Sequence, residues 1–335
     1  MWGSMREQGR VVEHENDGRE NSVPLSGILM SGTTTALIRT PICRWLVSLR
    51  VNHWTKSGFC LAALLFHGAV FDGSAWFAVL PAAICFCLIS SAVYLANDIF
   101  NRKEDRCHPN KRNRPIAAGH IAVRAAWAVV IALVATALGL SFVFYGGGSV
   151  TQVIIAYYLL SWLYSFCLRG LPLVDVLVIG LGFVARVAAG AFALQSFDFT
   201  AHPTGWLVGC TYFLALLLGF GKRKGEWLLM ESAGMALGST RRALRGYTAE
   251  LLNVLIGCSA LFAGSIYVAY CLSRSDRMPF ILTAVPALWG LLSYLKLAWG
   301  STAVETPEYL LLRSRSLLIS LVGWLVLVGW FTAVR

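Results

Sequence analysis

Charged side chains are scarce in this chain of 335 residues: Asp, Glu, Lys and Arg make up 13% of it, whereas hydrophobic residues make up 57%. Soluble domains typically contain about 25% charged and roughly 45–50% apolar residues. The apolar residues also come in runs of about 17–25, the length of helix that crosses a bilayer. These proportions exclude a soluble enzyme and predict an all-α polytopic membrane protein.

Paired cysteines are also missing. The nine cysteines form no CxxC motif, and their odd number argues against a disulfide framework. Most of them lie inside apolar runs, where a cysteine behaves as a small hydrophobic residue. We therefore expect neither a zinc site nor redox chemistry from them.

Two regions are expected along the chain. Residues 1–38 contain five of the 17 acidic residues among Asn, Gly and Ser, and they predict a disordered polar tail. Residues 39–335 predict a single transmembrane domain. It has about nine candidate spans, at 57–73, 77–98, 121–145, 151–168, 172–194, 204–220, 248–273, 278–299 and 315–333.

The net charge of +11 is concentrated between particular spans. With nine spans, the basic clusters in residues 39–56, 102–114 and 222–245 all fall on one side of the membrane. The opposite loops contain only Arg274, Arg277 and Arg335. By the positive-inside rule, we predict that the N-terminus and the basic loops are cytoplasmic. Since these charges flank membrane spans, we expect the bilayer and anionic substrates, not nucleic acid, as partners.

The end of the second span has the most informative polar pattern. Asn97, Asn101 and Asp105 follow one another at intervals of four residues, so they share one helical face, with Asp98 beside them. Oxygen ligands at a cytoplasmic helix end suit Mg²⁺, which combines a few carboxylates with water and substrate phosphates. The alternative is a polar helix end solvated by lipid headgroups. The basic loop that follows favours a site for phosphoryl groups.

The segment from Asn97 to Gly119 resembles the UbiA superfamily of intramembrane transferases. It matches the first aspartate-rich motif, NDxxDxxxD, and the following loop, KRxRPIxxG, although Asn101 replaces the usual middle Asp. The resemblance covers most of residues 45–330 and implies a bundle of nine helices. It also implies a metal site made of Asn97, Asp98, Asn101 and Asp105.

A second signature indicates the branch of the family. Members that prenylate aromatic rings generally carry DxxxD after the fourth span, whereas here Asp175 is followed four residues later by Ile179. Asp175 and Arg186 lie on one helical face, and an Arg inside an apolar helix is a candidate functional residue, unless it only fixes helix packing. Together with the motifs GFVxR and KRxxE, these residues resemble the decaprenyl-phosphate phosphoribosyltransferases, as a divergent member.

That branch joins phosphoribosyl pyrophosphate to a polyprenyl phosphate in the bacterial inner membrane. The resemblance implies Mg²⁺ as cofactor and Asp98, Asp105 and Asp175 as catalytic residues. Asp175 could order the ribose hydroxyls or a basic residue. The product would be a precursor of a lipid-linked arabinofuranose donor, for cell-wall arabinan or for a nodulation factor. The substrate-binding residues are expected to be Lys56, Lys111, Arg112, Arg114, Tyr164, Arg186, Lys222, Arg223 and Glu226.

Two other functions fit part of the pattern. One is a prenyltransferase that moves an isoprenoid from its diphosphate to an aromatic acceptor, with the same fold and metal. The other is a non-catalytic transporter or lipid-binding scaffold, which would explain the basic loops but not the carboxylates beside them. The sequence leaves the oligomeric state open.

Overall fold

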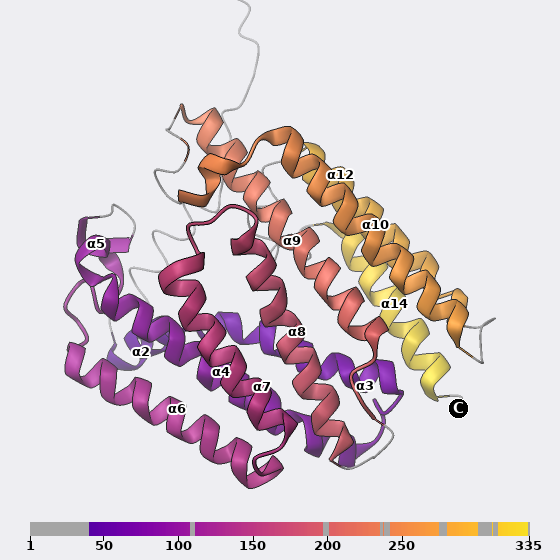
Figure 1. The fold of residues 1–335 in the computed structure, drawn as a ribbon, viewed down its shortest axis with the longest axis horizontal. Coiled ribbons are helices and arrows are strands. Elements are labelled where there is room, and N and C mark those ends of the chain that lie inside the picture. Colours follow the sequence, from indigo (N-terminus) through magenta and orange to yellow (C-terminus); the bar gives the residue numbers. More distant parts are fainter. Residues whose placement is uncertain are drawn as a thin grey trace, which may run out of the picture.

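A computed structural model describes residues 40–107, 111–196, 201–234, 237, 242–274, 280–300, 310 and 314–333. Every secondary-structure element within these ranges is helical, which confirms the all-α prediction. The expected disordered tail, residues 1–38, lies outside the described residues. Figure 1 shows a bundle of long helices that run between two ends.

Six helical segments in the described part of the chain are long and apolar enough to cross a membrane. They are α4 (Gly73–Phe100), α6 (Val123–Tyr145), Ser149–Leu168, α8 (Val174–Gln195), α9 (Gly205–Ser232) and α10 (Ala249–Ser273). The fourth of the predicted spans is not one uniform helix, because α7 (Ser149–Leu163) continues into the π-helix η3 (Tyr164–Leu168).

The other three predicted spans are not among these six segments of the described chain, so the count of nine membrane-crossing helices is not confirmed. The span predicted at 57–73 is instead a 3₁₀-helix, η1 (Val51–Leu61), followed by α3 (Ala62–His67). The last two correspond to α12 (Ala284–Gly300) and α14 (Arg315–Ala333). Glycine at position 68, with a φ of 83°, ends α3 in the left-handed region that favours glycine.

Polar caps define where several helices begin. The Asp72 carboxylate accepts a hydrogen bond from the Ser74 backbone N–H at 2.8 Å, at the start of α4. The hydroxyls of Thr204 and Thr248 accept in the same way at the starts of α9 and α10. Such caps satisfy N–H groups that have no partner inside the helix. The apolar sequence that follows each cap is buried in the bundle or faces outward.

Helices α4 and α8 form the centre of the first half of the bundle. Helix α4 packs against α6, α7, α8 and η1, and α8 packs against α7, α9 and η1. Gly190 of α8 lies directly against the backbone of Cys60, since a Cβ atom at Gly190 would be 2.0 Å from the Cys60 carbonyl oxygen. The 3₁₀-helix η1 is therefore fixed against α8.

The polar connections gather at one end of the bundle. There α4 leads into α5 (Arg102–Cys107), and the connections between α7 and α8 and between α9 and α10 lie at the same end, which is the upper end in Figure 1. Helix α2 (Pro41–Leu49) precedes η1. This arrangement brings the predicted site residues of several helices to one end.

Candidate functional site

Asp98 and Asp105 form a buried carboxylate pair. Asp98 lies in the last turn of α4 and Asp105 lies in α5, and each is 4% exposed. Helical hydrogen bonding continues across the junction, because the Asn101 N–H donates to the Asn97 carbonyl at 3.0 Å and the Asp105 N–H donates to the Asn101 carbonyl at 2.8 Å. The two carboxylates are therefore two helical turns apart on one side, as the spacing predicts.

Two arginines bind this carboxylate pair. Arg114 places one nitrogen, Nη1, 3.0 Å from Asp98 Oδ1 and 2.8 Å from Asp105 Oδ2. Arg50 Nη2 lies 2.9 Å from the same Asp98 oxygen, and its guanidinium carbon lies 4.6 Å from the centre of the Tyr94 ring. Arg114 is a predicted site residue. Arg50 was not predicted, although it precedes the first span among other basic residues.

The donor set of this cluster fits a divalent cation. Asp98 Oδ1 and Asp105 Oδ2 both contact a single cationic nitrogen, Nη1 of Arg114, so the two carboxylates are close enough to share one bound cation. Within the described residues, no three His, Cys, Asp or Glu side chains form a metal-binding group. Mg²⁺ fits such a sparse set, because it usually keeps several waters and takes further oxygens from substrate phosphates.

The two asparagines of the motif have different surroundings. Asn97 donates from Nδ2 to the Ser165 hydroxyl at 3.1 Å, which connects α4 to η3. Asn101 is the C-terminal cap residue of α4. The amide nitrogen of Asn97 is thus used in packing, and only its oxygen is suited to a metal.

The basic loop after α5 is folded back onto the carboxylates. Lys111 and Arg112 lie in a short 3₁₀-helix, η2 (Lys111–Asn113), and the Arg114 N–H donates to the Lys111 carbonyl at 3.0 Å. The Arg106 Nε–H donates to the Ala117 carbonyl at 2.8 Å and holds the far side of the loop. Arg112 is exposed, and Lys111 is half-buried. Lys56, on η1, is also half-buried.

Asp175 belongs to a second buried network. Its Oδ2 forms an ion pair with Arg223 Nε at 2.9 Å, and its Oδ1 accepts a hydrogen bond from the Tyr247 hydroxyl at 2.9 Å. Arg223 also pairs with Glu226. Both side chains of the central ion pair are almost fully buried, with 3% exposure for Arg223 and none for Asp175. Tyr164 begins the π-helix η3 and is half-buried.

Tyr247 was not predicted, and it joins this network to the chain before α8. Its hydroxyl accepts the Leu173 N–H at 2.7 Å, and Leu173 has a φ of 65°, an uncommon backbone conformation for leucine. Burial, together with the negative charge of Asp175, raises the pKa of Tyr247, so this hydroxyl remains a donor. No sequence motif marks Tyr247, because the contact depends on how two connections meet.

Arg223 and Glu226 lie within a helix and not in a loop. The sixth span was predicted to end at residue 220, but α9 continues to Ser232. Lys222 is half-buried on this helix. Its neighbour Lys224 faces a different direction and donates to Asn253 Oδ1 at 2.6 Å, against α10. The continued helix therefore presents Arg223 to Asp175 and Lys224 to the packing of the second half of the bundle.

Arg186 lies deeper in the bundle and does not pair with Asp175. It donates to the Ser90 hydroxyl at 3.0 Å, to the Tyr157 hydroxyl at 2.8 Å and to the Gly182 carbonyl at 2.8 Å. Its guanidinium carbon lies 4.6 Å from the centre of the Tyr157 ring. Among the described residues, Arg186 has no acidic partner, and its Nε–H is buried without an acceptor. This is a buried cation held by neutral groups.

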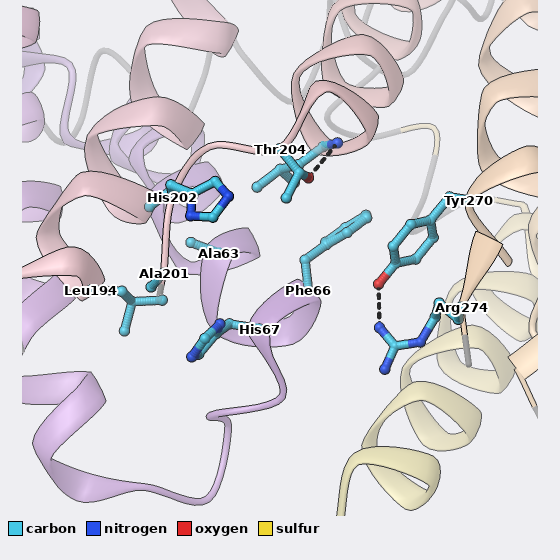
Figure 2. Close-up of a pocket in the computed structure, with 11 residues that line it drawn as sticks. Ala63, Phe66, His67, Leu194, Ala201, His202, Thr204, Tyr270 and Arg274 are labelled. Carbon is cyan, nitrogen blue, oxygen red and sulfur yellow. Dashed lines mark hydrogen bonds between the residues drawn. The ribbon is translucent and has the colours of Figure 1, made fainter. Parts of the chain in front are cut away.

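A cavity of about 180 Å³ lies at the opposite end of the bundle. Figure 2 shows His67, His202 and Tyr270 around it, with the Tyr270 hydroxyl bonded to Arg274 at 2.7 Å. These residues come from the end of α3, the connection before α9 and the end of α10. The cavity is separate from both carboxylate networks, so we do not assign it to the site.

The described part of the chain is thus an all-helical bundle with carboxylates and arginines gathered at one end, the arrangement that the motifs predict for an intramembrane transferase. Residues 57–314 match the UbiA prenyltransferase family, and the chain belongs to this family. The family resemblance predicted from the motifs is thus confirmed.

Curated relatives support the same branch. The chain is 33% identical over 231 residues to a decaprenyl-phosphate phosphoribosyltransferase of Corynebacterium glutamicum, covering 68% of this chain and 66% of the relative. It is 30% identical over 292 residues to the Mycobacterium tuberculosis protein of the same name, covering 84% of this chain and 92% of the relative. Nodulation protein NoeC of Azorhizobium caulinodans is 30% identical over 159 residues, covering 46% of this chain and 50% of the relative.

The fold is also similar to solved structures. A UbiA homolog from Archaeoglobus fulgidus, bound to DMAPP and Mg²⁺, superposes with a TM-score of 0.63 and 18% identity. The match covers 86% of this chain and 98% of that structure. At this identity the likeness establishes the fold, and a divalent cation with its substrate is a property of that neighbour.

Proposed function

We propose that this protein transfers the 5-phosphoribosyl group of phosphoribosyl pyrophosphate to a polyprenyl phosphate and releases diphosphate. The observation that carries the proposal is Arg186, a buried cation without an acidic partner among the described residues, inside the bundle behind the carboxylate pair. The identity to the two decaprenyl-phosphate phosphoribosyltransferases supports it.

The position of Arg186 distinguishes two kinds of donor. Its partner Ser90 precedes Asp98 on α4 by eight residues, which is about 12 Å along the helix. A prenyl diphosphate is charged at one end only, so its apolar tail would lie against this guanidinium. Phosphoribosyl pyrophosphate and a lipid phosphate supply additional phosphate groups, which a guanidinium binds in bidentate fashion. A donor and an acceptor that together carry several phosphates therefore match basic side chains that lie both at the end of the bundle and, at Arg186, deeper inside it.

The residues at the bundle end would then hold the donor in place. Asp98 and Asp105 would bind Mg²⁺, which when bound neutralises charge that builds up on the leaving diphosphate. Arg114, Lys111 and Arg112 would bind the diphosphate oxygens. Arg223 and Lys222, with Lys56 across the end of the bundle, would bind the remaining phosphate groups.

The transfer itself needs little acid–base chemistry. A lipid phosphate monoester, with a second pKa of about 6, is mostly dianionic at neutral pH, so no proton has to be removed from it. One of its oxygens forms the new bond to C1 of the ribose, and the bond from C1 to diphosphate breaks with inversion. Positive charge develops on the ribosyl ring, as in other glycosyl transfers.

Within this proposal, Asp175 has a positioning role. Both of its oxygens are used, one by Arg223 and the other by Tyr247, and it is fully buried. A carboxylate so engaged orients a basic residue, and it is a poor candidate for a base or a metal ligand. Glu226 holds the other side of the same guanidinium.

The test uses membranes that contain the protein, Mg²⁺ and a polyprenyl phosphate. Radiolabelled phosphoribosyl pyrophosphate should transfer label to the lipid fraction, and Asp98→Ala should abolish the transfer while the protein still inserts. Label that enters lipid only from a prenyl diphosphate, in the presence of an aromatic acceptor, would replace this proposal with prenyl transfer. Cation-independent lipid binding without turnover would indicate a scaffold.

We also propose that the basic end of the bundle faces the cytoplasm of a bacterial inner membrane, where a phosphorylated sugar donor is available. The product would supply a lipid-linked arabinofuranose donor. The identity to nodulation protein NoeC favours arabinosylation of a nodulation factor as its use. Mass analysis of the lipid product would define the prenyl chain, and accessibility of a cysteine introduced at the exposed position 112 would define the sidedness.

A further inference from the structure

The position where both carboxylates of the candidate metal site converge is held by a guanidinium. Arg114 Nη1 contacts Asp98 at 3.0 Å and Asp105 at 2.8 Å, and Arg50 contacts the same oxygen of Asp98 at 2.9 Å. Two negative and two positive side chains meet in this cluster, so its formal charge is balanced. A divalent cation that entered alone would face two guanidiniums at contact distance.

The acids and the arginines differ in how firmly they are held. The side chains of Asp98 and Asp105 are 5% exposed and lie on helices, whereas Arg50 and Arg114 are 26% and 31% exposed. Arg114 belongs to a loop. Arg50 lies at the junction of α2 and η1, with a left-handed backbone φ of 51°. The arginine side chains can therefore turn away while the carboxylates stay in place.

A diphosphate resolves the electrostatic conflict. It brings negative charge together with the cation, and its oxygens accept bidentate, charge-assisted hydrogen bonds from guanidinium groups. An arginine that leaves a carboxylate for such an oxygen keeps an anionic partner throughout. The cation and the diphosphate thus compensate each other at this cluster.

We propose that Arg50 and Arg114 occupy the carboxylate pair in the resting protein and move to the diphosphate oxygens of the donor when it binds with its divalent cation. The proposal assigns Arg50 as a further substrate-binding residue and makes the cation and the diphosphate bind as a unit. It rests on the proposed function only in that the donor carries a diphosphate.

The test measures binding separately from turnover. Purified protein in nanodiscs is mixed with radioactive Mn²⁺, alone or with ³²P-labelled inorganic diphosphate or phosphoribosyl pyrophosphate, and both labels retained with the protein are counted after ultrafiltration. Wild-type protein should retain Mn²⁺ weakly alone and about tenfold or more tightly with either diphosphate, the size expected for one charge-assisted hydrogen bond.

Arg114→Gln should bind Mn²⁺ alone more tightly than wild type and should lose most of the gain that diphosphate provides. Arg50→Gln should have the same two effects as Arg114→Gln: tighter binding of Mn²⁺ alone and a smaller gain from diphosphate. Lys103→Gln, an exposed neighbour that makes the same change in charge, should behave as wild type. Asp98→Asn should retain Mn²⁺ in neither condition.

Equal Mn²⁺ affinity with and without diphosphate in wild type, or no change in Arg114→Gln, would overturn the proposal. If Arg114→Gln does not elute as a folded protein on gel filtration, Arg50→Gln and Arg114→Lys decide the question. Lysine keeps the charge but cannot bind diphosphate oxygens in bidentate fashion, so Arg114→Lys should lose part of the gain that diphosphate provides. Coupled binding without label transfer to lipid would refute the proposed function alone. Transfer with uncoupled binding would refute only the arginine exchange.

Discussion

Replacing Asp175 by Asn tests whether this residue positions Arg223. The carboxylate receives the Arg223 guanidinium and the Tyr247 hydroxyl, both at 2.9 Å and fully buried. Asn is nearly the same size and keeps one oxygen acceptor, but it has no charge. The substitution therefore removes about one charged hydrogen bond, or about 1.5–3 kcal/mol. Since about 1.4 kcal/mol corresponds to a factor of ten, kcat/KM for phosphoribosyl pyrophosphate should fall about 10- to 150-fold.

The assay follows label transfer by purified protein over a range of donor concentrations between about pH 6 and 9. A displaced Arg223 should raise KM for the donor and leave the shape of the pH profile unchanged, because no proton transfer is lost. Asp72→Asn is the matched control, since Asp72 caps the opposite end of α4 and lies far from the site. The reasoning is refuted if Asp175→Asn stays within about twofold of wild type, or if the acidic limb of the pH profile disappears.

Three further predictions follow from other contacts. Arg186→Met should strongly reduce the affinity for the donor or the acceptor. The unfolding temperature should stay the same or rise, because a buried charge without an acidic partner is replaced by an apolar side chain. A lower unfolding temperature would contradict this prediction. Gly190→Ala should lower the free energy of unfolding by about 1–3 kcal/mol, because the added Cβ would be 2.0 Å from the Cys60 carbonyl oxygen. The control Gly139→Ala on α6 should not destabilise the protein, because a Cβ there meets open space. Burial raises the pKa of Tyr247 above 10, the ordinary value for a tyrosine, so the contribution of its neutral hydroxyl to stability should be complete below pH 10 and decline above it. In unfolding measurements at alkaline pH, Tyr247→Phe should lack this decline.

The carboxylate pair could be predicted because its geometry is local. Asp98 and Asp105 are connected by continuous helical hydrogen bonding, so a spacing of seven residues is enough to place them on one side. The apolar helices were likewise predictable from length and composition, and most predicted boundaries lie within a few residues of the observed ones. The first span could not be predicted in this way, because η1 has 3₁₀ geometry and α3 ends at Gly68.

The partners of the site residues could not be predicted in the same way. Arg50 is 48 residues from Asp98, and Tyr247 is 72 residues from Asp175. Each contact depends on how separate helices pack: Arg50 begins the entry segment 50–56, which resembles the same branch but does not reveal this contact, and Tyr247 belongs to no sequence motif. The helical spacing of Asp175 and Arg186 suggested that they share a face, but Asp175 pairs with Arg223 across to α9. A periodicity within one helix cannot decide between two helices.

The lengths of α4 and α9 set the depth of the site in the bilayer. Each has 28 residues, or about 42 Å, whereas the hydrocarbon core is about 30 Å thick. Helices α6 and α8, with 23 and 22 residues, are close to that thickness. Asp98 lies 25 residues, or about 38 Å, after the start of α4, and Arg223 lies 18 residues, or about 27 Å, after the start of α9, so both are close to one boundary between acyl chains and water. A sugar phosphate arriving from water and a phosphate on a membrane-bound isoprenoid can meet there, without either one crossing the apolar interior.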